Sequence, residues 1–113
     1  MSTSINDIAK DIHQIAVEHG WWENDEHFNQ AEKIALMHSE LSEALEAQRN
    51  GNPLSEKAIL AGQSITCVEE ELADCIIRIL DFGEAMLMDI ERAVLLKNEY
   101  NRTRPYRHGN KKF

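Results

Sequence analysis

Two pairs of acidic residues with matching spacing lie inside apolar helical patterns, and they constrain the fold more than any other feature. Glu40 and Glu43 form the first pair, and Glu71 and Asp74 form the second. With about 100° of turn per residue, Glu40 and Glu71 fall in the centre of the apolar stripes of their helices, and the second acid of each pair lies about 60° away. Buried charges are rare unless they are neutralised. The pattern therefore predicts two helices that meet around a cation.

Apolar residues recur at helical spacing along most of the chain, whereas the alternation typical of strands is absent. The isoleucines at 5, 8, 12 and 15 mark one stripe of a first helix, which Ser4 and Asp7 begin with a capping pattern. The expected fold class is all-α, a single domain over residues 1–113 that resembles a four-helix bundle. The helices are expected over about 5–18, 28–48, 64–88 and 89–101, with 54–62 as a short helical piece or a loop and 21–27 as a loop.

Charge is distributed unevenly along the chain. Residues 1–91 hold 5 basic and 19 acidic side chains, a net charge of −14, and residues 92–113 hold 7 basic and 1 acidic, a net charge of +6. The acidic body is expected to repel nucleic acid polymers, although the basic C-terminal tail, about 102–113, could bind a small anion. No apolar run is long enough for a membrane span and no secretory signal pattern opens the chain, so we expect a cytoplasmic protein. Cys67 and Cys75 are expected to be reduced core residues.

The kind of cation follows from the donor atoms available. Arg78 and Lys33 lie on the acidic faces and could neutralise two of the four charges, which leaves a deficit. A di-iron bundle would need Glu-x-x-His pairs, and the sequence has none. Carboxylates alone favour a hard cation, so the predicted cofactor is magnesium, with manganese possible. The alternative is that the Glu-x-x-Glu spacing marks only a solvated helix face.

The acidic segments also resemble a known signature. Glu40-Leu41-Ser42-Glu43 and Glu71-Leu72-Ala73-Asp74 are similar to the Glu-x-x-Glu and Glu-x-x-Asp motifs of MazG-like nucleotide pyrophosphohydrolases, which belong to the all-α nucleoside triphosphate pyrophosphatase superfamily. The stretch from Lys97 to Tyr106 resembles the Lys-x-x-x-Asn-x-x-Arg segment of that family, and His19-Gly20-Trp21-Trp22 resembles its amino-terminal aromatic segment. The link over 54–68 is longer than is usual in the family.

This resemblance implies an enzyme that cleaves nucleoside triphosphates between the α and β phosphates and releases a monophosphate and pyrophosphate. It implies a homodimer or homotetramer, and the apolar character of the third helix on nearly every side also favours a homo-oligomer. Damaged-nucleotide removal and nucleotide pool control are both compatible with it. The implied catalytic metal ligands are Glu40, Glu43, Glu71 and Asp74, and the implied substrate-binding residues are Lys97, Asn101, Arg104, Tyr106 and Trp22.

Several alternatives stay open at this level. One of Trp21 and Trp22 is expected to pack inward, and either could instead stack on a base. Asp81 lies about 80° from Glu71 on the helix and could support the metal site or pair with a cation. The alternative function is a non-catalytic helical module that binds a nucleotide or another protein.

Overall fold

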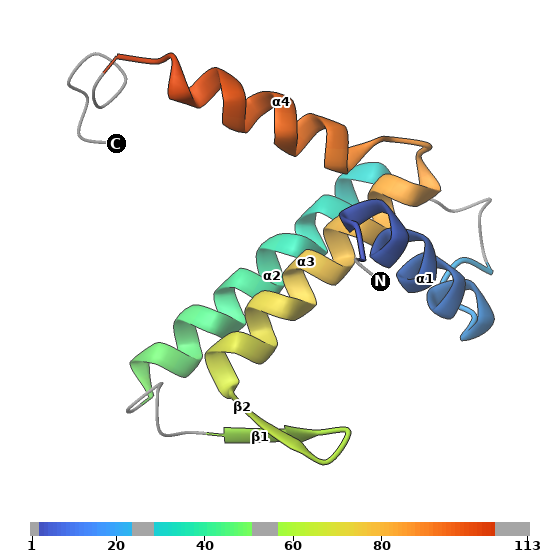
Figure 1. Cartoon of the computed structure of the whole chain (residues 1–113). Coiled ribbons are helices and arrows are strands. Elements are labelled where there is room, and N and C mark those ends of the chain that lie inside the picture. Colours follow the sequence, from blue (N-terminus) through green and yellow to red (C-terminus); the bar gives the residue numbers. More distant parts are fainter. Residues whose placement is uncertain (1–2, 24–28, 51–56, 106–113) are drawn as a thin grey trace.

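The computed structural model describes residues 3–23, 29–50 and 57–105 and is mostly helical, as predicted (Figure 1). The elements, in chain order, are α1 (Ile5–Glu18), α2 (Gln30–Arg49), β1 (Lys57–Leu60), β2 (Gln63–Thr66), α3 (Cys67–Ala85) and α4 (Ile90–Arg102).

Three of the helices form the body of the molecule. Helices α2 and α3 run antiparallel and side by side along most of their length, and α1 packs against the C-terminal half of α3 (Figure 1). The core between them is small, because none of the large side chains in the described residues is completely buried. Its buried apolar residues are Ala9, Ala44, Cys75, Leu80 and Phe82. Cys75 fits the expectation of a reduced core residue, whereas Cys67 is free but partly exposed.

Local capping explains where two of the helices begin. The hydroxyl oxygen of Ser4 accepts a hydrogen bond from the backbone N–H of Asp7 at 3.1 Å, and the Asp7 carboxylate accepts one from the Ser4 N–H at 3.3 Å. This reciprocal pair satisfies N–H groups that lack partners within the helix, and it confirms the predicted start of α1. Thr66 and Glu69 form the same arrangement at the start of α3.

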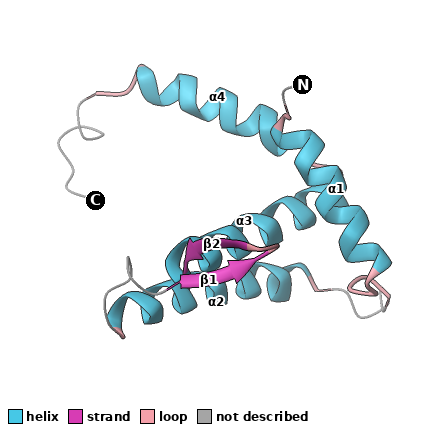
Figure 2. Cartoon of the chain, turned by 60° about the horizontal axis from the view of Figure 1, so that its bottom comes forward, coloured by secondary structure: helices cyan, strands magenta, loops and turns pink. Residues whose placement is uncertain are grey.

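A β-hairpin precedes α3, so the expectation of a strand-free chain was wrong (Figure 2). Strands β1 and β2 pair in antiparallel register, with Leu60 opposite Gln63. The two residues between the strands, Ala61 and Gly62, have φ of 50° and 78°, which is the backbone geometry that tight hairpin turns require. Alanine seldom adopts positive φ, and the turn was therefore not apparent from residue types. As a result, α3 begins at Cys67 instead of Ser64.

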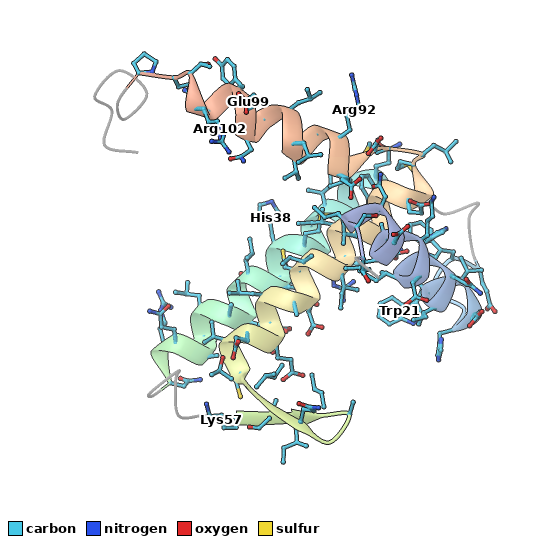
Figure 3. The ribbon with its side chains drawn as sticks, viewed as in Figure 1. Trp21, His38, Lys57, Arg92, Glu99 and Arg102 are labelled. Carbon is cyan, nitrogen blue, oxygen red and sulfur yellow. The ribbon has the colours of Figure 1, made fainter. Side chains whose placement is uncertain are left out.

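Helix α4 does not complete a four-helix bundle within one chain, which corrects the predicted architecture. Its first turn is anchored on the body: Ile90 packs against Gly83, and the Glu91 carboxylate accepts a hydrogen bond from the backbone N–H of Ile5 at 2.8 Å. Beyond Glu91 every residue of α4 is exposed, and the helix runs away from α2 and α3 (Figure 1). Figure 3 shows Arg92 projecting from α4 on the side opposite the body.

Large apolar side chains remain exposed on both parts of the chain. On the body they include Ile34, Leu41, Leu45 and Ile76, and on α4 they include Val94, Leu95, Leu96 and Tyr100. Among the helices that the structure describes, none combines the length and hydropathy needed to cross a membrane.

Candidate metal centre and neighbouring aromatic pocket

Helices α2 and α3 bring three of the predicted metal ligands together. One carboxylate oxygen from each of Glu40, Glu43 and Glu71 lies within 4.8 Å of the others. Glu40 is buried, Glu71 is half-buried and Glu43 is exposed, so the group opens toward solvent on the Glu43 side. The antiparallel packing of the two helices produces this arrangement, because each acid lies on the helix face that contacts the other helix.

The electrostatics of the group favour a bound proton or cation. Burial raises the pKa of Glu71 from 4.5 to about 7, and a hydrogen bond with Glu43 and the negative charges of Glu43, Asp74 and Glu40 add to this effect. Its Oε2 is inaccessible to solvent and has no hydrogen-bond partner among the described residues. A buried oxygen without a partner is costly, and a cation at this position would remove that cost.

Asp74 lies beside the group of three and is not part of it. Burial, followed by the negative charges of Glu40 and Glu70, raises the pKa of the Asp74 carboxyl. Asp74 lies one helical turn after Glu71, and the pKa values of both carboxyls are raised by burial and by the neighbouring carboxylates.

Arg78 neutralises one of the acids. Its Nε donates a hydrogen bond to Oε1 of Glu40 at 2.7 Å, and the Glu40 side chain is only 9% exposed. Lys33 was also expected to neutralise one of the acids. Its Nζ instead lies over the Trp22 ring, 4.3 Å from the ring centroid. One guanidinium therefore faces several carboxylates, and negative charge remains in excess.

The donor atoms suit a hard divalent cation. The group of three consists of carboxylates alone, without histidine or cysteine, and magnesium and manganese prefer oxygen ligands. The Oε2 of Glu71 has no hydrogen-bond partner among the described residues and is therefore available as a metal ligand.

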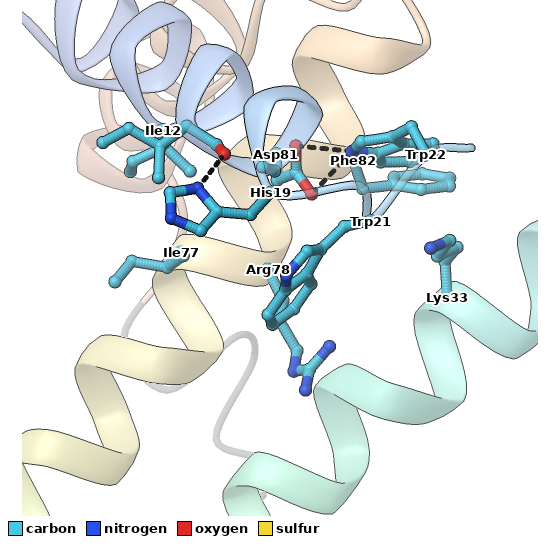
Figure 4. A pocket seen from close by; sticks show the side chains of 11 residues that line it. Ile12, His19, Trp21, Trp22, Lys33, Ile77, Arg78, Asp81 and Phe82 are labelled. Atoms are coloured by element: carbon cyan, nitrogen blue, oxygen red, sulfur yellow. Dashed lines mark hydrogen bonds between the residues drawn. The ribbon is translucent and has the colours of Figure 1, made fainter.

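An aromatic pocket of about 310 Å³ is linked to the acidic group through Arg78, which lines the pocket (Figure 4) and donates to Glu40. Its walls come from the C-terminal half of α1, the turn that follows it, α2 and α3. Trp21 is 59% exposed at the opening, whereas Trp22 is half-buried, so Trp22 is the tryptophan that packs inward. The lining is mostly apolar, and its charged members are Lys33, Arg78 and Asp81.

Asp81 holds one wall of this pocket in place. The indole Nε1 of Trp22 donates to both Asp81 oxygens at 3.1 and 3.2 Å, and the His13 ring lies 2.7 Å from Oδ1. His13 and Trp22 also meet edge to face, with ring centroids 5.6 Å apart. Asp81 thus supports the aromatic pocket and does not contact the metal ligands. The sequence missed this network, because its members are 59 and 68 residues apart and share no periodic pattern.

The structure does not bring the predicted phosphate-binding residues to the acidic group. Lys97 and Asn101 lie on α4, and Arg104 follows it. Lys97 and Arg104 both approach the ring of Tyr100, with Nζ at 4.6 Å and Cζ at 5.5 Å from its centroid. Within a single chain α4 runs away from α2 and α3, the helices that carry Glu40, Glu43 and Glu71 (Figure 1). Tyr106 lies outside the described residues.

Comparisons of the chain with models of protein families, with curated proteins and with solved structures found no match. The resemblance to MazG-like enzymes consequently depends on the motifs quoted above.

Proposed function

We propose that this chain is a magnesium-dependent nucleoside triphosphate pyrophosphohydrolase that cleaves between the α and β phosphates. The observation that carries the proposal is the convergence of Glu40, Glu43 and Glu71, with the buried Oε2 of Glu71 left without a partner. A polyphosphate would be repelled by an acidic group alone, so the acids imply a cation between them and the substrate.

The residues of the group would have different roles. Glu40 and Glu71, with Asp74 beside the group as a further ligand, would hold magnesium, or manganese in its place. When bound, the metal would polarise a phosphoryl oxygen and lower the pKa of a water molecule. Glu43 is the exposed member and is the best situated to accept a proton from an attacking water.

The aromatic pocket supports a nucleotide as the substrate. Trp21 and Trp22 line a pocket that is linked to the acids through Arg78, and aromatic faces stack on nucleobases without selecting a particular base. Arg78 and Lys33 also line this pocket and would attract the phosphates. The phosphates would contact Lys97, Asn101 and Arg104 only if α4 of a second chain reaches the site.

A homodimer or homotetramer would supply α4 of a second chain to the site. The body carries exposed Leu41, Leu45 and Ile76, and α4 carries exposed Leu95 and Leu96. Burial of these side chains against another copy would remove about 25 cal/mol of unfavourable solvation per Å². The net positive charge of the C-terminal region and the negative charge of the body are complementary.

The test is hydrolysis of a panel of canonical and modified nucleoside triphosphates with magnesium in water enriched in oxygen-18. We expect pyrophosphate and a monophosphate as products, with the label in either one, which identifies the phosphorus attacked. Release of orthophosphate alone would contradict the proposed cleavage.

Glu71→Gln is the decisive variant. We expect activity to fall at least about 100-fold, because loss even of a group that supports a metal ligand costs about 10- to 100-fold. Folding should be retained or improved, since the change removes a repelled buried charge. Glu46→Gln, an exposed acid on α2 outside the group, is the matched control and should remain active.

The alternative is a non-catalytic helical module that binds a nucleotide or a protein. The separation of Lys97 and Arg104 from the acids within one chain favours it. Absence of turnover on every triphosphate by a folded protein that still binds nucleotide would support this alternative.

A further inference from the structure

Arg78 belongs to both the acidic group and the aromatic pocket. Its Nε donates to Glu40 at 2.7 Å, while its Cζ lies 5.7 Å from the centroid of the Trp21 ring and its side chain forms part of the pocket wall. Figure 4 shows Arg78 passing beneath Trp21 toward α2, the helix that carries Glu40. The same guanidinium can therefore respond to a ligand in the pocket and to a cation at the acids.

The bond to Glu40 opposes metal binding. A dication held by Glu40 and Glu71 would lie close to the guanidinium, and two positive charges at that distance repel each other. The side chains of Glu40 and Arg78 are 9% and 27% exposed, so water screens this repulsion less than it would on an open surface. Arg78 and the metal consequently compete for the Glu40 carboxylate.

A phosphate group in the pocket would relieve this competition. The hydrogen bond to Glu40 uses Nε, and among the described residues the guanidinium donates no other hydrogen bond. Guanidinium groups bind phosphate oxygens through two parallel N–H donors, which is a stronger arrangement than a single bond. A phosphate near the mouth of the pocket is thus a better partner for Arg78 than one oxygen of Glu40.

We propose that Arg78 is a positioning residue that couples the two sites: a phosphate-bearing nucleotide in the pocket draws the guanidinium from Glu40, and the freed Glu40 then binds the metal more tightly. The inference rests on the proposed function, because it takes the acidic group to be the metal site. The coupling is reciprocal, so the metal also strengthens nucleotide binding by the same factor. Coupling between sites is typically about fivefold or more in affinity.

The experiment measures manganese binding to the full chain by the electron paramagnetic resonance signal of the free ion. Separate titrations contain adenosine, guanosine, cytidine or uridine monophosphate, which have no α–β bond to cleave. In the wild type we expect at least one monophosphate to lower the dissociation constant for manganese about fivefold or more. The matching unphosphorylated nucleoside should have no effect, and inorganic phosphate shows whether the pocket must also be filled.

Arg78→Met separates coupling through the guanidinium from direct contact between nucleotide and metal. This variant should bind manganese more tightly than the wild type without nucleotide, and the monophosphate should then change the dissociation constant no further. Lys33→Met is the matched control, because Lys33 lines the same pocket but pairs with Trp22. It should weaken nucleotide binding and leave the coupling factor unchanged. If Arg78→Met does not fold, Arg78→Lys keeps the charge without the planar donors and should lose most of the coupling.

Each outcome decides the question. An equal coupling factor in the wild type and in Arg78→Met, or no nucleotide effect on the wild type, overturns the role of Arg78 while the metal site stands. Failure of the wild type to bind manganese at all overturns the proposed function, and this inference with it.

Discussion

The α1–α3 body and helix α4 differ in where their apolar side chains go. In the body, helices pack against one another and bury Leu80 and Phe82, and charged groups such as Glu40 are drawn inward with them. In α4 no residue is buried, although the helix carries Leu95, Leu96 and other apolar side chains. Most helical stability in proteins comes from packing of an apolar face, so α4 lacks within its own chain what stabilises the body.

The difference has a counterpart in charge. The body concentrates acids around Glu71, whereas the sequence from residue 92 onward is rich in bases, and α4 runs away from α2 and α3 within one chain (Figure 1). A second copy of the chain would bring an acidic surface to a basic one and cover apolar surface on both. Within one chain the apolar side chains of α4 stay exposed, and a second copy of the chain is the partner that we propose for them.

The largest expected effect is on self-association. Leu95→Glu combined with Leu96→Glu places two charges on the exposed apolar surface of α4, and burial of a charge at an interface costs several kcal/mol. We expect the wild type to be a dimer or tetramer and this variant to be a monomer with little hydrolytic activity. Sedimentation equilibrium gives the mass of each. Asn98→Glu, which adds a charge at a polar position of the same helix, is the control for charge alone. A monomeric wild type would contradict the role given to α4.

The second prediction concerns pH. Because the pKa of Glu71 is raised from 4.5 to about 7, the folded chain binds this proton more tightly than the unfolded chain does. The resulting stabilisation is fully present below pH 4.5 and is lost as the pH rises through about 7. We expect the urea midpoint of the metal-free protein to fall over this range, and magnesium to restore it at the upper end. Glu71→Gln should flatten the profile, and equal slopes in both proteins would exclude Glu71 as the titrating group.

How far the sequence predicts this fold depends on whether a feature is local. The cap at Ser4 was predicted correctly, because a capping pattern involves neighbouring residues, and the start of α4 lies within one residue of the predicted position 89. The hairpin was missed because its turn places Ala61 at positive φ, which its residue type does not indicate. The direction of α4 was also missed, since it depends on the contact of Ile90 with Gly83 and on non-local bonds to α1.

In the candidate site, too, the features set by local pattern were predicted and those that depend on distant contacts were not. Helical periodicity placed Glu40 and Glu71 on inward faces, and antiparallel packing of two long helices is enough to make such faces meet. The link between Asp81, His13 and Trp22 required the turn after α1 to fold back over α3. Periodicity carries no information on such a turn, and for this reason the pocket emerged only from the structure.

A smaller effect is expected at residues 83–90, the joint between the body and α4. A Cβ at position 83 would lie 2.6 Å from Cγ1 of Ile90, closer than packed atoms allow. Gly83→Ala should therefore destabilise the chain by about 1–3 kcal/mol, the range for overpacked sites, or else shift α4 away from the body. Urea unfolding measures the first outcome, and hydrogen exchange at the Ile5 amide, which donates to Glu91, reports the second. Ile90→Ala removes Cγ1 together with Cδ1, so Gly83→Ala should cost less stability when it is made in that background.

The smallest effect tests whether the joint itself is strained. Leu87 has φ of 58° and is 94% exposed, so it adopts a left-handed conformation that disfavours side chains and gains nothing from burial. Glycine is the usual residue at this position after a helix, and Leu87→Gly should raise the free energy of unfolding by about 1 kcal/mol. Leu87→Ala keeps the Cβ and should leave stability near that of the wild type. If alanine stabilised the chain as much as glycine, the gain would come from removing an exposed apolar side chain, and the joint would hold α4 at its angle without strain.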